Sequence, residues 1–489
     1  MKILLLTCAS VISVFLLVIG VSNVYQDKLS DYSFDLVKAQ HENTTSGDDI
    51  EILNNITIQN GTDPGLGISP DTDDIVAVFH RVGNDSTNLY MIQSQDNGTT
   101  FTDPVRVNSK EGDADPAYIS PPVRFGPQGE IFVSWGRIVP HETFWGVGDI
   151  RLARSTDGGK SFEPTIYPAI NEPISEKLYA DLAISSNGTI LIPYVNNELI
   201  KVNESSIAYN MDQIDYITQM YVLRSDDDGK SFDRITLDNE GCQCCDTATA
   251  TGPNNEIYIA YRDSERNKIQ HDDYSNKYIT NNSESEYVDK TALEQGLIEV
   301  PVYSTVRDIV ISHTTDKGNG LQFSKPVKVQ GLEWYMNGCP SVGAGMQFDN
   351  NGTMHVGYFT GNGTEGSGYY YVQSTDMGQT FSKPIPLHTA EFVPPSHTNM
   401  DLAIDKNNNI WIAFVTLPEQ VGDEMEHGET SKTLNIVSLD PIGKLLGEIS
   451  FPSKLGSAPS NPSLIPVSDG VMLGYSTDNN FSMLTLSTA

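Results

Sequence analysis

The residues best suited to chemistry are four cysteines in the second half of the chain. Three of them stand in GCQCCDTATA and one in NGCPSVGAG, while a histidine and a methionine stand in PPSHTNMDLAI. Thiolates together with an imidazole and a thioether suit Cu(I) or Zn(II). The candidate metal ligands are Cys242, Cys244, Cys245, Cys339 and His397, with Met400 nearby. Disulfides among the four cysteines are the alternative, because exported cysteines usually pair; one disulfide beside two redox-active thiols is a third.

Charged residues supply a second set of candidates. The segments YRDS and VRDI carry two Arg-Asp pairs, which are candidate catalytic residues or structural salt bridges: Arg262 with Asp263, and Arg307 with Asp308. Guanidinium forks match carboxylates in a bidentate way. The arginines that end three equivalent predicted strands are therefore candidates for binding an anionic substrate: Arg81, Arg137 and Arg262. His80 and His141 are expected at the surface.

These residues act together only if the fold brings them to one place, and an internal repeat predicts how. A short motif recurs intact at 94–101 (SQDNGTTF), 155–162 (STDGGKSF), 225–232 (SDDDGKSF) and 374–381 (STDMGQTF), with weaker copies at 314–323 and 438–444. Segments of alternating apolar and polar residues between turns, which are typical of strands, occur at 73–81, 129–137, 188–196, 255–263, 352–360, 408–416 and 469–477. Repeats of about 60 residues with short strands indicate an all-β fold, a β-propeller of four-stranded antiparallel blades.

We expect seven blades, with six as the alternative. The last unit shows only three strands, so the segment EILNNITIQN (51–60) is expected to supply the fourth and to close the ring. Closure removes the exposed edges that an open sheet would present.

The recurring motif, Ser-x-Asp-x-Gly-x-Ser/Thr-Phe, resembles the Asp-box repeat of sialidases and other extracellular propellers over about residues 60–486. The resemblance implies that Asp96, Asp157, Asp227 and Asp376 staple hairpin turns on one face of the ring. The opposite, top face, where the innermost strands begin, then carries the cysteines, His397 and the Arg-Asp pairs. Together these motifs resemble those of a sialidase-like subgroup that carries a Cys-x-Cys-Cys motif. This resemblance does not imply a particular activity.

Sialidase chemistry itself is only partly matched. The resemblance implies three arginines, a tyrosine nucleophile helped by a glutamate, and an aspartate as acid and base. The family's Phe-Arg-Ile-Pro motif is missing from the first inner strand, where this chain has LGISPDTDD, and GRIVP (136–140) stands in another strand. Whether the chain is an enzyme therefore stays open, with a sialidase-like glycosidase acting on acidic glycans as one alternative.

The N-terminus predicts export. Residues 3–24 carry no charge and are long enough to span a bilayer, so 1–24 is a signal peptide or a membrane anchor. Residues 25–50 are a predicted polar linker, and 51–489 the propeller. Many Asn-x-Ser/Thr sequons accord with a glycoprotein. We expect an extracellular or cell-surface protein that touches the membrane only through residues 3–24.

Charge excludes one class of partner and leaves others open. The formal net charge of −34 argues against nucleic acid, whose phosphates need a basic face. A glycan or a cell-surface protein is the expected partner. The leading hypothesis is a binding or scaffold propeller with a cysteine-rich site on its top face. A Cu or Zn site or a thiol-redox site is the alternative, and Ca²⁺ is less favoured because the Asp-box turns already explain the Asp-rich loops.

Overall fold

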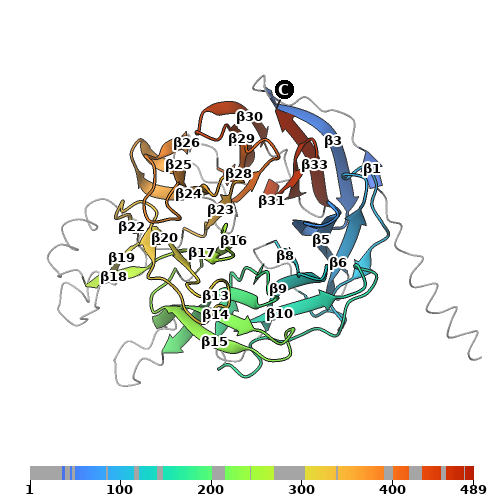
Figure 1. Ribbon diagram of the computed structural model, residues 1–489, viewed down its shortest axis with the longest axis horizontal. Helices are drawn as coiled ribbons and strands as arrows, with labels where there is room; N and C mark the ends of the chain where they lie inside the picture. Colours follow the sequence, from blue (N-terminus) through green and yellow to red (C-terminus); the bar gives the residue numbers. More distant parts are fainter. Residues whose placement is uncertain are drawn as a thin grey trace, which may run out of the picture.

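The computed structural model describes most of the chain, and the residues it describes form strands and turns without a helix. The described residues are 36–38, 45–46, 50–83, 86–114, 120–139, 147–173, 175–200, 215–242, 244–268, 303–336, 340–389, 400–417, 432–452, 459–477 and 480–488. Their strands form small antiparallel sheets arranged in a ring, a seven-bladed β-propeller (Figure 1). None of these residues belongs to a helix that is long and apolar enough to cross a membrane. The predicted signal or anchor, 3–24, lies outside them.

The first four blades follow the repeat. Blade one is β4 (Thr62–Ile68), β5 (Ile75–Val82), β6 (Thr87–Ser94) and β7 (Val105–Arg106). Blade two is β8 (Val123–Phe125), β9 (Ile131–Val139) and β10 (Val147–Ser155), with a bridge between Leu152 and Ile166 in place of a fourth strand. Blade three is β12 (Ala183–Ile184), β13 (Ile190–Ile200), β14 (Asp215–Ser225) and β15 (Asp233–Asp238), with β11 (Glu176–Leu178) also paired to β13. Blade four is β16 (Ala248–Thr251), β17 (Ile257–Arg262), β20 (Ile309–His313) and β21 (Val327–Lys328).

The remaining three blades complete the ring. Blade five is β23 (Ala344–Phe348), β24 (Met354–Gly363), β25 (Gly366–Ser374) and β26 (Ile385–Thr389). Blade six is β27 (Asp401–Ile404), β28 (Ile410–Thr416), β29 (Thr433–Leu439) and β30 (Leu445–Pro452). Blade seven joins β31 (Pro459–Val467), β32 (Gly470–Thr477) and β33 (Asn480–Thr488) to β3 (Ile50–Gln59). A separate small sheet joins β18 (Glu265–Lys268), β19 (Tyr303–Val306) and β22 (Tyr335–Met336).

Closure of the ring unites the two ends of the propeller. The N-terminal β3 pairs along its length with the C-terminal β33, from Ile50 opposite Thr488 to Gln59 opposite Asn480. This confirms the closing strand predicted at 51–60. Two further short strands, β1 (Leu36–Lys38) and β2 (Thr45–Ser46), pair with β3 and with β30. The segment expected to be a linker therefore contributes two strands to the outer edge.

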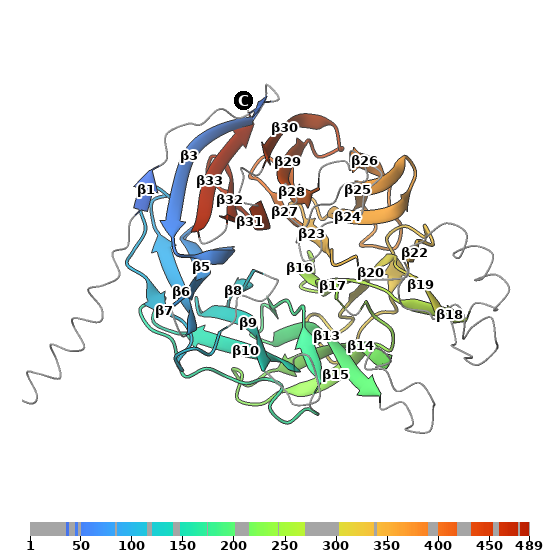
Figure 2. The same ribbon diagram turned by 180° about the vertical axis from the view of Figure 1, so that it is seen from behind.

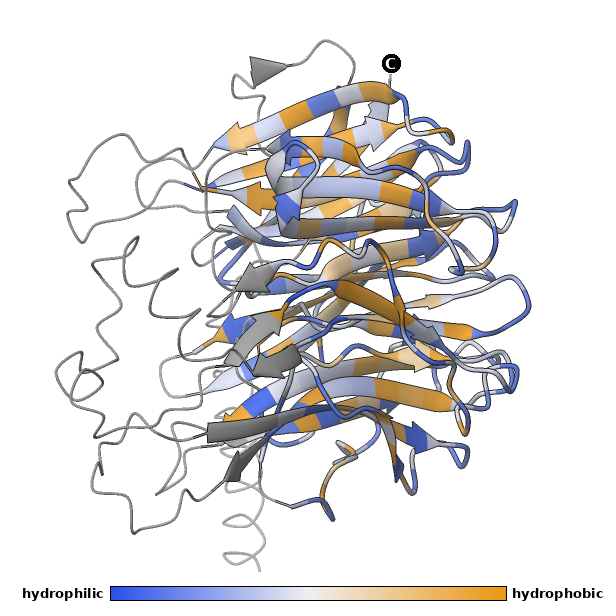
Figure 3. Cartoon of the chain, turned by 90° about the vertical axis from the view of Figure 1, so that its left-hand side faces the viewer, coloured by the Kyte–Doolittle hydropathy of each residue, from blue (hydrophilic) through white to orange (hydrophobic). Residues whose placement is uncertain are grey.

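The core lies between the blades, because each strand alternates its side chains between two packed faces. One cluster joins blades six and seven and includes Trp411, Leu464 and Leu484. Another joins blades seven and one across the closure and includes Ile58, Phe79 and Phe481. In the edge-on view of Figure 3, hydrophobic and hydrophilic positions alternate along the strands.

The recurring motif forms the turn after the third strand of its blade. In the first copy, Asp96 accepts hydrogen bonds from Ser94 Oγ (2.8 Å), the Thr100 amide (2.8 Å) and Thr100 Oγ1 (2.6 Å). These bonds lower the pKa of Asp96 to about 2, Thr100 contributing most. Gly98 has φ +81°, which favours glycine. Asp157, Asp227 and Asp376 bind their turns in the same way, which confirms the predicted staple role.

Candidate binding site in the axial channel

The seven innermost strands surround an axial channel. Strands β8, β16, β23 and β31 are seen around the centre from both sides (Figures 1 and 2). The channel forms a cavity of about 590 Å³, lined by residues of all seven inner strands and by the residues just before them. This volume lies in the roughly 300–1,000 Å³ range of small-molecule sites. Most of its lining is small, apolar or backbone, so its few charged side chains stand out: Arg124, Asp181, Asp246 and Asp401.

Arg124 and Asp181 form an ion pair inside this cavity. The Nη2 atom of Arg124, on β8, lies 3.0 and 3.2 Å from the two carboxylate oxygens of Asp181, which precedes β12. Asp181 also accepts the Thr249 amide at 2.7 Å and Thr249 Oγ1 at 2.8 Å, both from β16. One carboxylate thus ties together blades two, three and four. The Arg124 side chain stays 33% exposed and lines the cavity, where a guanidinium can donate to a ligand.

Two further carboxyls, Asp246 and Asp401, are half-buried in the same lining. Burial raises the pKa of Asp401 to about 6, although the Leu464 and Leu402 amides and Arg124 act in the opposite direction. Those amides lie 2.7 and 2.8 Å from the Asp401 oxygens. Burial also raises the pKa of Asp246 well above its ordinary value, and the charge of Asp181 adds to the effect.

The four charged groups therefore come from four blades and act on one another electrostatically. Near pH 6 a carboxyl with a raised pKa is partly protonated, so it can both donate and accept a hydrogen bond. Arg124 adds planar donors. Such a set suits a neutral, hydroxyl-rich ligand, or a reaction that needs a protonated carboxylic acid.

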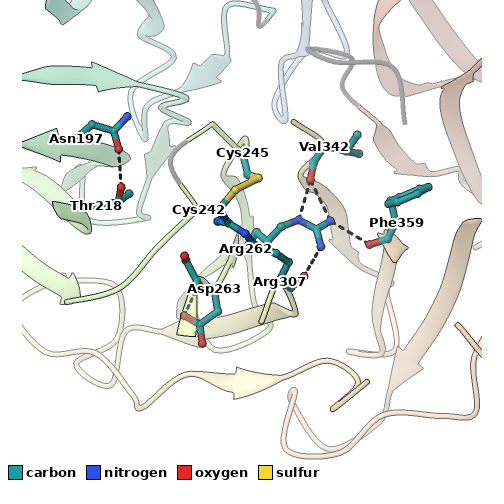
Figure 4. The surroundings of a disulfide bond; sticks show 10 residues. Asn197, Thr218, Cys242, Cys245, Arg262, Asp263, Arg307, Val342 and Phe359 are labelled. Carbon is teal, nitrogen blue, oxygen red and sulfur yellow. Dashed lines mark hydrogen bonds between the residues drawn. A yellow bond between two sulfur atoms is a disulfide. The ribbon is translucent and has the colours of Figure 1, made fainter. Parts of the chain in front are cut away.

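Three cysteines, Cys242, Cys244 and Cys245, lie in the segment that leads to Asp246 and are not part of the lining. Cys242 and Cys245 form a disulfide with Cα atoms 5.5 Å apart (Figure 4), which confirms the expectation of a disulfide. Cys244 is disulfide-bonded as well. The Sγ atoms of all three cysteines lie within 4.8 Å of one another. Metal ligation needs thiolates, which these three cysteines do not offer while they are disulfide-bonded. The Cu or Zn site therefore stays a prediction for the reduced chain. Cys339 and His397 lie outside the described residues.

Arg262 does not have the surroundings of a substrate-binding or catalytic arginine. Its side chain is 1% exposed and donates to the carbonyls of Val342 (3.1 and 3.2 Å), Phe359 (3.0 Å) and Arg307 (Figure 4). Its guanidinium also lies 5.3 Å from the centre of the Trp334 ring. Burial lowers the pKa of Arg262 to about 9. Every donor contact described for it is to a backbone carbonyl, so its role here is structural.

The other charged candidates also lie outside the cavity lining. Asp308 accepts the Glu333 and Trp334 amides and lies 3.7 Å from Lys328 Nζ. Burial raises its pKa, and it raises the pKa of Asp263 to about 6. The Arg307 amide donates to the Trp334 carbonyl at 2.8 Å. The ion pair described for these residues joins Asp308 to Lys328, so whether the two Arg-Asp pairs are catalytic or structural stays a prediction.

Arg81 and Arg137 do not join Arg262 around an anion in this structure. Arg137 contacts Asp113 (3.2 Å) and the Gly112 carbonyl, and the Arg81 guanidinium lies 5.4 Å from the Tyr90 ring centre. None of the three arginines lines the channel. His80, expected at the surface, is 1% exposed. His80 is buried because the second strand of blade one is buried on both faces. The Nδ1 atom of His80 lies 3.6 Å from Asp63 Oδ2.

Sequence reasoning missed the four charged residues that do line the channel. A signal for three of them was present in the repeat. Asp181, Asp246 and Asp401 each stand at or just before the start of an inner strand, in blades three, four and six. Aligning that position across the blades would have brought them together. Arg124 stands within its inner strand and gives no comparable signal.

Comparisons with known proteins agree on the fold alone. No family model and no curated protein matches the chain. Similar solved structures include a protein of unknown function from Dyadobacter fermentans, at 14% identity over 90% of this chain and 99% of that one, with a TM-score of 0.45. An ulvan lyase bound to a GlcA-Rha3S glycan has 11% identity over 87% and 93%, with a TM-score of 0.49. A Hadza microbial sialidase has 14% identity over 83% and 74%, with a TM-score of 0.42.

Proposed function

We propose that this chain is an exported, cell-surface propeller that binds a neutral glycan in its axial channel. One observation carries the proposal: Arg124, Asp181, Asp246 and Asp401 reach a single cavity from four blades. The uncharged segment at residues 3–24 and the sequons support export.

The charge of the cavity favours a neutral ligand over an acidic one. The positive charge of Arg124 is already matched by Asp181 at 3.0 Å. Asp246 and Asp401 add acidic groups without adding a cation, so a ligand carboxylate would meet net repulsion. Sugar hydroxyls instead both donate and accept, which complements guanidinium donors and carboxyls whose pKa values are raised by burial. We therefore favour a neutral glycan over the acidic glycans considered for the glycosidase alternative.

Glycan binding can be tested with the purified full-length chain on an array of neutral oligosaccharides and their uronic-acid or sialic-acid counterparts. We expect neutral glycans to bind, and Arg124→Ala to weaken binding by about tenfold or more because a charge-assisted donor is lost. Asp73→Asn is the matched control, since the Asp73 side chain is 69% exposed and lies outside the cavity. Preference for the acidic glycans, or equal binding by Arg124→Ala, would reject the proposed site.

A glycoside hydrolase is the second candidate, favoured by the raised carboxyl pKa values in the cavity. Such enzymes pair a protonated carboxylic acid with a second carboxylate. Burial gives Asp246 and Asp401 the character of the acid, and the ion-paired Asp181 supplies a carboxylate. A panel of chromogenic aryl glycosides tests this candidate. Turnover that falls by about 100-fold or more in Asp246→Asn would establish it, whereas binding without turnover would leave the binding function alone.

A further inference from the structure

Two loops that border the channel are held from behind by the same buried residue. The first runs from Cys242 to Thr247 and ends at β16, and the second precedes β23 and includes Val342 and Gly343. Asp246, Thr247 and Gly343 line the cavity. Figure 4 shows Arg262 between the Cys242–Cys245 disulfide on one side and Val342 on the other.

The first loop is fixed at both sides of Asp246. Its start is bound to β17, because the Cys242 amide donates to the Arg262 carbonyl at 2.9 Å. The disulfide then holds Cys245, which directly precedes Asp246 and, like Cys242, is 1% exposed. On the other side, Thr247 Oγ1 donates to the Tyr179 carbonyl at 2.8 Å. Asp246 is therefore the single residue between two anchored neighbours.

The second loop is fixed by the Arg262 side chain and presses on the first. Two guanidinium nitrogens of Arg262 donate to the Val342 carbonyl at 3.1 and 3.2 Å. Gly343 follows directly, and a Cβ atom there would lie 2.6 Å from the Asp246 carbonyl oxygen. Only glycine permits this close approach of two backbones. The backbone of Arg262 thus holds one loop while its side chain holds the other.

We infer that Arg262 and the Cys242–Cys245 disulfide are positioning residues that fix these two loops and so place Asp246 in the channel. The consequence for ligand binding rests on the proposed function, whereas the mechanical role does not. The arrangement gives a shared purpose to Cys242, Cys245 and Arg262, which do not themselves line the cavity.

Hydrogen exchange of the full-length chain, followed by mass spectrometry, tests the mechanical role without a ligand. In Arg262→Met we expect amides of 244–251 and 341–347 to exchange about tenfold faster or more, because buried carbonyls lose their donors. Reduction of the wild type with a phosphine, which also opens the disulfide of Cys244, should accelerate exchange in 244–251, whereas unreduced Cys244→Ser, which keeps Cys242–Cys245, should not. The reduction itself needs no variant to fold. Arg262→Lys, which keeps one donor group, should recover part of the protection.

Arg224→Met is the matched control for loss of a buried arginine. Arg224 is 7% exposed and also donates to a carbonyl of the next blade, that of Asn319, but it lies outside the cavity lining. We expect this variant to leave exchange in 244–251 unchanged. Equal acceleration in both variants, or no acceleration in Arg262→Met and in the reduced wild type, would overturn the positioning role.

Binding of a glycan selected on the array separates this inference from the proposed function. If Arg262→Met loosens the loops and raises the dissociation constant of the glycan by about tenfold, the positioning role contributes to ligand binding. If the loops loosen but wild type binds no glycan, the proposed function fails while the positioning role stands. If wild type and Arg262→Met bind equally tightly despite loosened loops, Asp246 is not part of the binding site.

Discussion

Asp401 predicts how the stability of this propeller depends on pH. Burial raises its pKa from 3.8 to about 6 in the folded chain. Between these values the folded chain binds more protons at Asp401 than the unfolded chain does. Asp401 therefore lowers the free energy of unfolding as pH rises from about 4 to 6. A rise from 3.8 to about 6 corresponds to a loss of about 3 kcal/mol.

Comparison with Asp401→Asn isolates this effect. The substitution also changes acceptors for the Leu464 and Leu402 amides, but that cost is the same at every pH. We expect wild type to lose about 3 kcal/mol more than Asp401→Asn between pH 3.5 and 7.5. The quantity to compare is the change in the free energy of unfolding between the two pH values, wild type minus Asp401→Asn. This double difference cancels the contribution of Asp263, whose pKa is also raised to about 6 and which is present in both proteins.

Equilibrium urea unfolding, followed by intrinsic fluorescence with disulfides intact, measures both proteins at the two pH values. Asp73→Asn again serves as the control for the substitution itself, since Asp73 is exposed. A double difference below about 0.5 kcal/mol would show that Asp401 is solvated in the folded chain, which would refute its burial in the channel wall.

The disulfide of Cys244, the backbone contact at Gly343 and the closing strand β3 can each be tested by one measurement. Peptide mapping under non-reducing conditions should show Cys244 linked to Cys339, since Cys242 bonds Cys245 and the fifth cysteine, Cys8, stands in the predicted signal or anchor; a free thiol at Cys339 would contradict this. Gly343→Ala should lower the free energy of unfolding by about 1–3 kcal/mol in urea titrations, because its Cβ would meet the carbonyl of Asp246; an unchanged midpoint would contradict the close approach. Ile58→Ala should cost about 2–5 kcal/mol, because Ile58 is 1% exposed in the core that closes the ring, and a loss below about 1 kcal/mol would mean that the closing strand contributes little.

The sequence by itself determined the architecture. Alternation along each strand and the recurring turn motif predicted the blades, because strand pairing and turn hydrogen bonds are set by residues close together in the chain. The turn bonds of Asp157 span only four positions. The missing fourth strand of the last unit predicted closure by the N-terminal segment. An open sheet edge would expose unpaired N–H and C=O groups that invite pairing with another chain.

Only the tertiary structure decided which residues face the channel and which support it. Arg262 donates to carbonyls 80 and 97 positions away. The residues next to it in the sequence do not indicate whether its side chain is buried or faces a ligand. Arg124 meets Asp181 across 57 positions, and Thr249 meets the same carboxylate from a third blade. These neighbours arise from the closing of the ring, which sets seven separate strands around one axis. Burial, pKa and hydrogen-bond partners follow from that convergence, so the site was decided by the assembled propeller rather than by any one segment.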